Sequence, residues 1–379
     1  MKKISLYITF LALAVTTVFQ SCETEIQLTG EFEPIPIIYG ILDQDDSIHY
    51  IKINRTFTGN NNPSASAMVP DSSYWNTVDA YVYEIDQISF VNADTLRVWQ
   101  LRDTLIQNKD TNGVFFGPEQ KVYYFLAGPN GSSRLKDSPD IKYVLKASMN
   151  SGEYYAESTT ELVRTDYSGA SDNVRITNPT STQDWNFATF PGGNIDYKTE
   201  VLQFYIGNAD LFNVKMVILY DEYQGASVES KELKWSLGEY ATEGQTGTYS
   251  LTILGEEFYK FIGENVADDP AVTKRQFTGL RIDIVAGSAE LYKYIQITAP
   301  STSLSQAQPT YSNIAGAYGL WASRTSISQY KPAYNPASAS LRALTKSSLE
   351  ALCVGSAYTS SLKFCSGHPA DNTEIWYCP

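Results

Sequence analysis

Short runs of alternating apolar and polar residues, separated by turn residues, fill the chain from residue 35 to about residue 165. In the stretch 48–53, Ile and Tyr recur at even spacing, which is the period-2 pattern of a half-buried strand. Turn residues such as Gly128-Pro129-Asn130-Gly131 separate the runs. We therefore predict strands over 36–42, 48–53, 79–85, 95–102, 121–126, 141–149 and 154–162. About seven short strands are typical of an immunoglobulin-like β-sandwich.

A second β-rich region follows a stretch of Ser, Thr, Asn, Gly and Pro over 166–195, at whose start we place a domain boundary. We predict strands over 201–206, 214–223, 231–237, 248–254, 279–285 and 292–298. Phe258, Phe261, Ile262 and Val266 have helical spacing, and Pro270 follows them, so one helix interrupts the strands. The leucines within 338–351 predict another helix.

The expected fold class is therefore mainly β. We expect an immunoglobulin-like sandwich over 35–165 and a second β-rich domain with one or two short helices over 166–335. A C-terminal helix and a cysteine-containing tail are expected over 336–379.

The N-terminal segment has the pattern of a bacterial lipoprotein signal. Lys2 and Lys3 precede an uncharged run over 4–19, and Ser21-Cys22 follows. We predict a cleaved signal peptide over 1–21, lipidation of Cys22 by acyl chains such as palmitate, and an acylated tether over 22–34. The alternative is an uncleaved N-terminal anchor. The uncharged run is shorter than the roughly 20 residues that a spanning helix needs.

The chain is acidic, with a formal net charge of −14. This balance argues against nucleic acid as a partner and against electrostatic binding to anionic lipid, because both require clustered Lys and Arg. The 27 tyrosines suit strand surfaces first and contact surfaces second.

Three of the four cysteines, Cys353, Cys365 and Cys378, lie near the C-terminus. In an exported protein this pattern favours a disulfide between two of them, and the sequence leaves the pair open. A zinc site that combines the three thiols with His368 is an alternative, as is an unpaired or intermolecular thiol.

The sequence offers little catalytic chemistry. It has two histidines, and the alternation places His49 on the polar face of its strand. A Gly-x-Ser-x-Gly elbow is absent, so a Ser/His/Asp hydrolase is not expected. We assign no catalytic residue, no metal and no cofactor, and we predict that the protein is not an enzyme. A carboxylate pair for glycan cleavage stays open as an alternative, because 42 acidic residues always offer pairs.

The long connection between Phe57 and Trp75 contains candidate contact residues. Loops of this length are usually functional or mobile. Tyr74 and Trp75 are suited to contact a partner or a glycan. The alternative is that Trp75 packs on its own domain.

A family resemblance rests on four stretches. They are Cys22-Glu23-x-Glu25-Ile26, Ile37–Leu42, Ser47–Arg55 and Tyr311–Trp321. They resemble a family of Bacteroidota outer-membrane lipoproteins that carries a domain of unknown function. Members share a Thr-Asn-Ile-x-x-Gly-x-Gly-hydrophobic-Phe stretch, and this chain has Trp321 where Phe is usual and an extra Cys378.

The resemblance implies a lipid-anchored β-sandwich protein of the outer membrane, often found with TonB-dependent transporter systems. It supplies no catalytic residues. Gly316 and Gly319 are expected to serve a tight turn or a close backbone approach. Trp321 joins Tyr74 and Trp75 as a candidate contact residue.

We therefore expect a non-enzymatic lipoprotein at the cell surface that binds a partner protein or an extracellular ligand, as an accessory of an outer-membrane transporter or assembly complex. The alternatives are a glycan-degrading surface enzyme that uses two carboxylates and a purely structural envelope protein.

Overall fold

A computed structural model describes residues 32–57, 63–89, 92–113, 115–128, 130–165, 173–180, 182–299, 310–338 and 341–378. The predicted signal peptide and Cys22 lie outside these residues. The chain divides into two units, Met1–Pro34 and Ile35–Pro379, and the second contains all the strands and helices that the structure describes. Strands dominate and helices are few and short, so the predicted mainly-β class is confirmed. Among the described helices, none is long and apolar enough to cross a membrane.

The N-terminal sandwich has two sheets that share one hydrophobic core. Its strands are β1 (Pro36–Asp43), β2 (Ile48–Arg55), β3 (Val78–Ser89), β4 (Asn92–Gln100), β5 (Arg102–Gln107), β6 (Glu119–Leu126), β7 (Ile141–Met149), β8 (Tyr154–Thr160) and part of β17 (Tyr318–Pro332). The sheet orders are β17-β1-β2-β6-β5 and β4-β3-β7-β8. Ile38 and Ile51 of the first sheet and Val82 and Leu145 of the second belong to that core. Two short helices, α2 (Pro63–Ala67) and α3 (Pro70–Ser73), connect β2 to β3.

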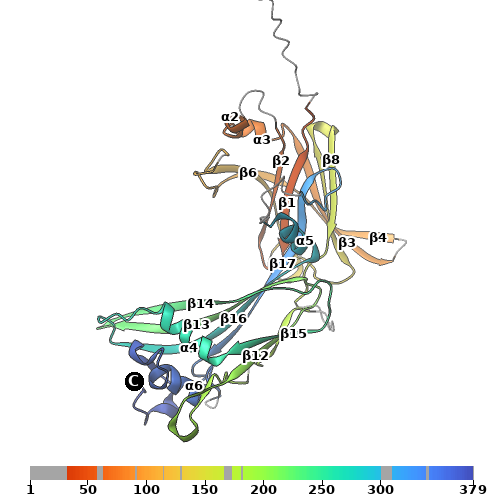
Figure 1. Ribbon diagram of the computed structural model, residues 1–379. Coiled ribbons are helices and arrows are strands. Elements are labelled where there is room, and N and C mark those ends of the chain that lie inside the picture. Colours follow the sequence, from red (N-terminus) through yellow and green to blue (C-terminus); the bar gives the residue numbers. More distant parts are fainter. Residues whose placement is uncertain are drawn as a thin grey trace, which may run out of the picture. The chain divides into compact units, whose positions relative to one another are not determined.

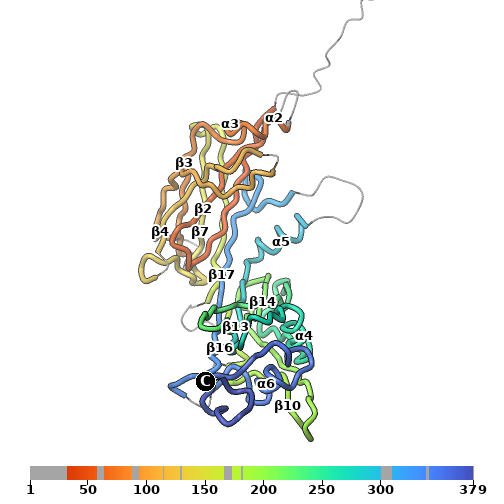
Figure 2. Tube along the Cα trace, turned by 90° about the vertical axis from the view of Figure 1, so that its left-hand side faces the viewer, coloured from red at the N-terminus to blue at the C-terminus, as the bar shows by residue number. Residues whose placement is uncertain are grey.

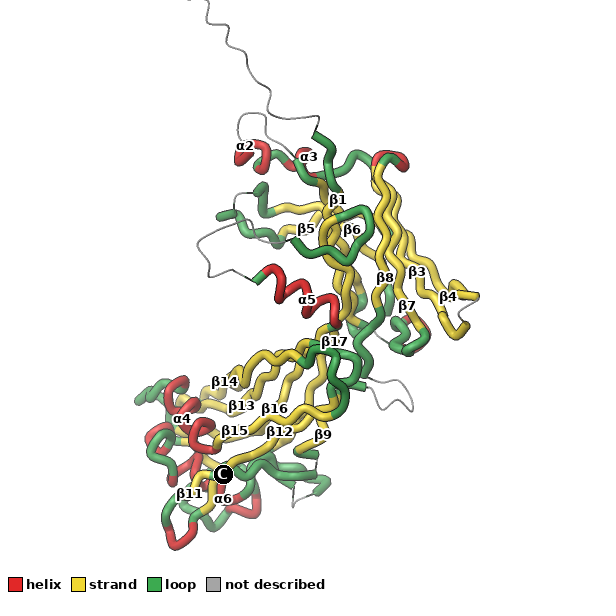
Figure 3. The backbone as a smooth tube through the Cα atoms, turned by 45° about the vertical axis from the view of Figure 1, so that its right-hand side comes forward, coloured by secondary structure: helices red, strands yellow, loops and turns green. Residues whose placement is uncertain are grey.

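The C-terminal sandwich surrounds a second core. Its strands are β9 (Arg175–Asn178), β10 (Ala188–Thr189), β11 (Asp196–Tyr197), β12 (Thr199–Tyr205), β13 (Leu211–Gln224), β14 (Ser227–Ala241), β15 (Thr248–Leu254), β16 (Lys274–Gly287), β18 (Phe364–Ser366) and the rest of β17. One layer is β14-β13-β16-β17 with β18 beside β16, and the other is β15-β12-β9. Helix α4 (Gly255–Asn265) and helix α6 (Lys346–Glu350) contribute to the same core through Phe258 and Leu349. Figure 3 shows how few helices accompany the strands.

Strand β17 belongs to both sandwiches. Its first half, Tyr318 to Arg324, pairs in parallel with β1, and its second half, Arg324 to Pro332, pairs antiparallel with β16. Figure 1 shows β17 in blue beside the orange-red β1, although the two are far apart in the sequence. In Figure 2 the same blue trace leads from the strands of one sandwich to those of the other. The two predicted domains, 35–165 and 166–335, therefore share a sheet.

The Tyr311–Trp321 stretch forms the entry of β17 into the N-terminal sandwich. Asn313 clamps the backbone of Trp321: its Nδ2 donates to the Trp321 carbonyl at 2.6 Å, and its Oδ1 accepts from the Trp321 amide at 2.9 Å. Gly319 has φ +125°, and a Cβ there would collide with the Ile38 carbonyl oxygen. Gly316 has φ +77°, and a Cβ there would collide with the Tyr155 carbonyl oxygen. The predicted close backbone approach is confirmed at both glycines.

Two predicted elements are wrong. Residues 292–298 form part of helix α5 (Ala289–Thr298) instead of a strand. Their β-branched and aromatic composition favours a strand, but Leu291, Ile295 and Thr298 are half-buried at helical spacing, and the packing against β17 decides. The helix predicted over 338–351 is reduced to α6 and a π turn over Ala351–Gly355, because the Thr345 hydroxyl caps the helix by accepting from the Ser348 amide at 3.3 Å.

The predicted orientation of His49 is also wrong. Strand β2 turns His49, Ile51 and Ile53 toward the core, while Ile48 and Tyr50 are exposed. The strand has isoleucines on both of its faces. Burial of Ile51 and Ile53 decides which face is turned to the core, and His49 lies on that face. Its ring stacks on Phe125 with the centroids 4.7 Å apart, and burial lowers its pKa to about 4.

Candidate functional site

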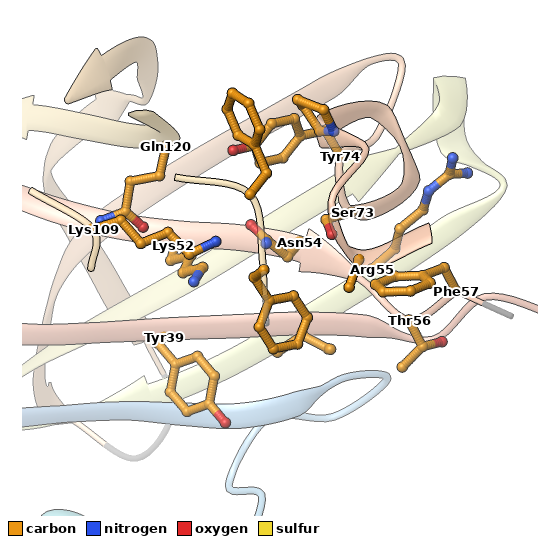
Figure 4. A pocket seen from close by; sticks show the side chains of 15 residues that line it. Tyr39, Lys52, Asn54, Arg55, Thr56, Phe57, Ser73, Tyr74, Lys109 and Gln120 are labelled. Carbon is orange, nitrogen blue, oxygen red and sulfur yellow. The ribbon is translucent and has the colours of Figure 1, made fainter. Parts of the chain in front are cut away.

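A cleft of about 350 Å³ lies on the outer face of the N-terminal sandwich (Figure 4). Tyr39 of β1 and Lys52 and Asn54 of β2 contribute to it from the sheet, because their strand neighbours Ile38, Ile51 and Ile53 occupy the core side. Helices α2 and α3 border the cleft from one direction. The connection between β5 and β6 borders it from another, through Lys109, Phe115 and Phe116. Segments well separated in the sequence therefore meet at one site.

The helical border of the cleft is fixed by Arg55 and its neighbours. The Arg55 guanidinium donates to the carbonyl oxygens of Ser72 at 3.2 Å and Asp71 at 3.1 Å, and it lies over the ring of Trp75. The Trp75 indole donates to the Asn54 carbonyl oxygen at 2.8 Å. Arg55 is thus committed to holding α3, although it lines the cleft.

Backbone contacts also hold the opposite border. The Phe116 amide donates to the Ala67 carbonyl oxygen at 3.0 Å, which joins the β5–β6 connection to α2. The hydroxyl of Tyr74 accepts from the Lys121 amide at 3.0 Å, which joins the end of α3 to β6. The segments that border the cleft are therefore held in place by hydrogen bonds, as is common for largely pre-formed ligand sites.

Two half-buried lysines, Lys52 and Lys109, add positive charge to that of Arg55 in the cleft. Burial lowers the pKa of Lys52, and the positive charge of Lys109 lowers it further. Burial also lowers the pKa of Lys109, whose ammonium lies 5.2 Å from the centroid of the Phe115 ring. Figure 4 shows Lys52 and Lys109 next to one another. Among the described residues, no carboxylate lies within salt-bridge distance of either ammonium group.

Lys121 of β6 lies near the cleft and provides a contrast. Its ammonium is 3.4 Å from the Asp103 carboxylate. Burial opposes protonation of Lys121, but the charges of Tyr123 and Asp103 outweigh it and raise the pKa. Lys52 and Lys109 differ from Lys121 because no carboxylate of the described part of the chain lies beside them.

Tyr39 lines the cleft, and its hydroxyl is engaged by Tyr294, which does not line it. Burial and a hydrogen bond with Tyr294 of α5 raise its pKa to about 12. The two rings meet edge to face with centroids 5.9 Å apart. The hydroxyl therefore stays protonated at any physiological pH.

Of the three contact residues that the sequence predicts, the structure places one at the cleft and two in the core. Tyr74 lines the cleft. Trp75 and Trp321 are 2% and 0% exposed, and the Trp321 indole donates to the Tyr143 carbonyl oxygen at 2.9 Å. Both rings are core residues, so neither is available to a ligand in this structure. Cys22, the predicted lipidation site, lies outside the described residues.

The cysteine-containing tail is a structural element. Cys365 and Cys378 form a disulfide, with Cα atoms 5.6 Å apart, and Cys353 is a buried free thiol. The prediction of a disulfide from two of the three cysteines is confirmed. His368 caps a short turn by accepting from the Ala370 amide at 3.1 Å. Because the disulfide uses two thiols, the alternative zinc site is not formed here, and the described residues contain no cluster of His, Cys, Asp and Glu arranged to hold a metal.

The sequence reasoning missed Lys52, Lys109 and Phe115. Lys52 could have been found from its position in β2. Side chains alternate along a strand, so Lys52 faces away from the core if Ile51 and Ile53 face it. Lys109 and Phe115 are in a turn-like connection, and only the fold brings them to β2.

Comparison with known proteins does not assign the chain to a family. No protein-family model matches the chain, and no curated protein matches it.

Proposed function

We propose that the protein is a non-enzymatic, acyl-anchored outer-membrane lipoprotein that binds an extracellular ligand or a partner protein in the cleft beside Lys52. The single observation that carries the binding half is a bounded cleft with aromatic walls, whose two lysines have no carboxylate partner among the described residues. The lipobox around Cys22 and the family resemblance support the anchor, the surface location and the role as an accessory of a transporter or assembly complex.

The composition of the cleft favours binding over catalysis. None of its lining residues is Asp, Glu or His. Hydrolysis of a glycosidic bond by the usual route needs two carboxyl groups that flank the bond. The alternative of a glycan-degrading enzyme therefore has no support at this site.

The anchor is tested by replacing Cys22 with Ser and fractionating cells. We expect the variant to leave the outer-membrane fraction, and intact mass of the native protein to show acyl chains. A Cys22→Ser variant that stays in that fraction, or a native protein without acyl chains, would contradict the anchor.

Binding is tested by thermal shift of the mature lipoprotein in detergent against panels of small molecules, peptides and glycans. Gln120→Trp fills the cleft, and Leu126→Trp is the matched control, because Leu126 is exposed on the same strand but does not line the cleft. We expect at least one class of compound to stabilise the protein and the Leu126→Trp control but not Gln120→Trp. If no compound distinguishes the two variants, the cleft is not the binding site.

A further inference from the structure

We propose that the cleft binds a ligand that carries a carboxylate next to an aromatic ring, with the carboxylate between Lys52 and Lys109 and the ring against Phe57 and Phe115. This inference rests on the proposed binding function and names its ligand class. It follows from how charge, apolar surface and volume are distributed within the cleft.

The carboxylate is inferred from the two ammonium groups. Bringing two cations together in a half-buried site disfavours both charges, and a bound anion removes that cost. Two cations of the C-terminal sandwich have such a partner: Arg275, which is 1% exposed, has Glu222 at 2.8 Å, and Arg342 has Asp371 at 3.1 Å. Lys331 is buried as a single cation without a hydrogen-bond partner among the described residues, and burial lowers its pKa to about 8. The cleft is where a pair of neighbouring described lysines lacks such a partner, so the ligand supplies it.

The aromatic ring is inferred from the wall of the cleft. Phe57 and Phe115 meet edge to face with their centroids 6.5 Å apart, and Ile37 and Phe116 extend the apolar surface. Aromatic rings favour such offset and edge-to-face neighbours. Because Lys109 lies over Phe115, the cationic part and the aromatic part of the cleft are adjacent. The anion and the ring of the ligand must therefore be adjacent too.

The cleft fits a carboxylate better than a phosphate. Phosphate sites commonly use a free guanidinium fork or a cradle of backbone amides at a helix N-terminus. Arg55, the one arginine among the lining residues, already donates to two carbonyl oxygens, and α2 and α3 are too short to provide a helix N-terminal site.

The volume fits one aromatic acid or one terminal residue of a peptide. A cavity of about 350 Å³ is at the small end of ligand sites. The same chemistry therefore has two sources: a free arylalkanoic acid, or the C-terminal carboxylate of a peptide that ends in an aromatic residue.

The experiment compares matched probes by ligand-observed NMR titration of the mature lipoprotein in detergent. The first pair is 3-phenylpropionate and the neutral 3-phenylpropanamide. The second pair is Gly-Gly-Ser-Phe with a free and with an amidated C-terminus. Phenyl phosphate tests the other anion. The variants are Lys52→Gln/Lys109→Gln and Phe115→Ala, with Lys121→Gln as the control, because Lys121 has Asp103 as its partner.

We expect an acid to bind at least about tenfold more tightly than its amide, which corresponds to a hydrogen bond between charged groups. The double lysine variant should abolish this preference, Lys121→Gln should retain it, and Phe115→Ala should weaken acid and amide alike. Binding of 3-phenylpropionate identifies a small acid as sufficient, whereas binding of the free peptide alone identifies a peptide C-terminus. Either result supports the inference.

The inference is overturned if acid and amide bind equally, if phenyl phosphate binds more tightly than the acids, if the double lysine variant keeps the preference, or if no probe binds. These failures are separable from a failure of the proposed function. If neutral compounds stabilise the protein and Gln120→Trp abolishes their effect, the cleft is a binding site for another class of ligand.

Discussion

The C-terminal sandwich pairs its buried arginines with carboxylates, whereas the cleft of the N-terminal sandwich leaves Lys52 and Lys109 without one among the described residues. In the C-terminal sandwich, Arg275 donates to Glu222 at 2.8 Å and to the carbonyl oxygens of Leu362 at 2.6 Å and Ala267 at 2.8 Å. These contacts join β16 to the tail.

The difference separates a cation that is satisfied within the chain from the two lysines of the cleft, for which we propose an external ligand. A buried charge is tolerated when hydrogen bonds and an opposite charge satisfy it within the chain. Arg275 meets this condition completely. Lys52 and Lys109 do not meet it among the described residues. Burial lowers the pKa of both lysines, and the charge of Lys109 lowers that of Lys52 further. Among the described residues, the cleft therefore holds two neighbouring cations without a carboxylate beside them.

The largest effect is expected from Arg275→Leu. The change leaves Glu222 and two carbonyl oxygens without their donor in a buried site, so the free energy of unfolding should fall by about 4 kcal/mol. Chemical denaturation measures it. Arg281→Leu is the control on the same strand, because Arg281 pairs with Glu232 and Asp283 near the surface. The control should cost less than about 1 kcal/mol. If the free energy of unfolding falls equally in Arg275→Leu and Arg281→Leu, the distinction between a buried and a surface ion pair is contradicted.

The disulfide between Cys365 and Cys378 should contribute slightly less to the free energy of unfolding than Arg275 does. The sequence separation of 13 residues predicts a loss of about 3 kcal/mol in the Cys365→Ala/Cys378→Ala variant, because the unfolded chain gains freedom. Cys353→Ala is the control, since it removes a buried thiol but no crosslink. If the control loses as much stability as the double variant, packing of the thiols and not the crosslink stabilises the tail.

His49 should make the protein sensitive to acid. Its pKa is about 4 in the folded state against an ordinary 6.5, so below pH 6.5 the unfolded chain binds a proton that the folded protein excludes. Stability from this residue is therefore lost as the pH falls, by about 2 kcal/mol between pH 7 and pH 5. Denaturation of wild type and His49→Leu at both values measures the difference. Identical pH dependence in the two proteins would show that His49 is not buried in its neutral form.

The smallest effect on stability is expected at the cleft. Lys52→Gln and Lys109→Gln remove charges that have no carboxylate partner among the described residues, so at pH 7 each should leave stability unchanged or raise it by about 0.5 kcal/mol. As the pH rises through the lowered pKa values, the folded wild type should gain stability that the variants do not gain. A clear destabilisation by either variant at pH 7 would reveal a partner within the chain.

Alternation and turn chemistry predicted most strands well, including β7 and β15 with their exact bounds. They failed where tertiary packing decides the structure. At His49, the strand has isoleucines on both faces, so the sequence does not show which face is buried. At α5, the local composition favours a strand, but the segment packs as a helix. The double role of β17 could not be predicted, because its partner β1 lies far away in the sequence. The same limit hid Lys109 and Phe115 from the candidate site, while Tyr74 was found because it ends a long loop.

The most direct test of whether Lys52 and Lys109 lack a carboxylate partner is an NMR titration of the lysine ammonium groups in the ligand-free protein. Lys52 and Lys109 should titrate below the ordinary value for lysine, and Lys121, with Asp103 beside it, should titrate above it. Lysines of the cleft that titrate at or above the value of Lys121 would contradict the account, because a carboxylate of the chain would then already occupy the place assigned to the ligand.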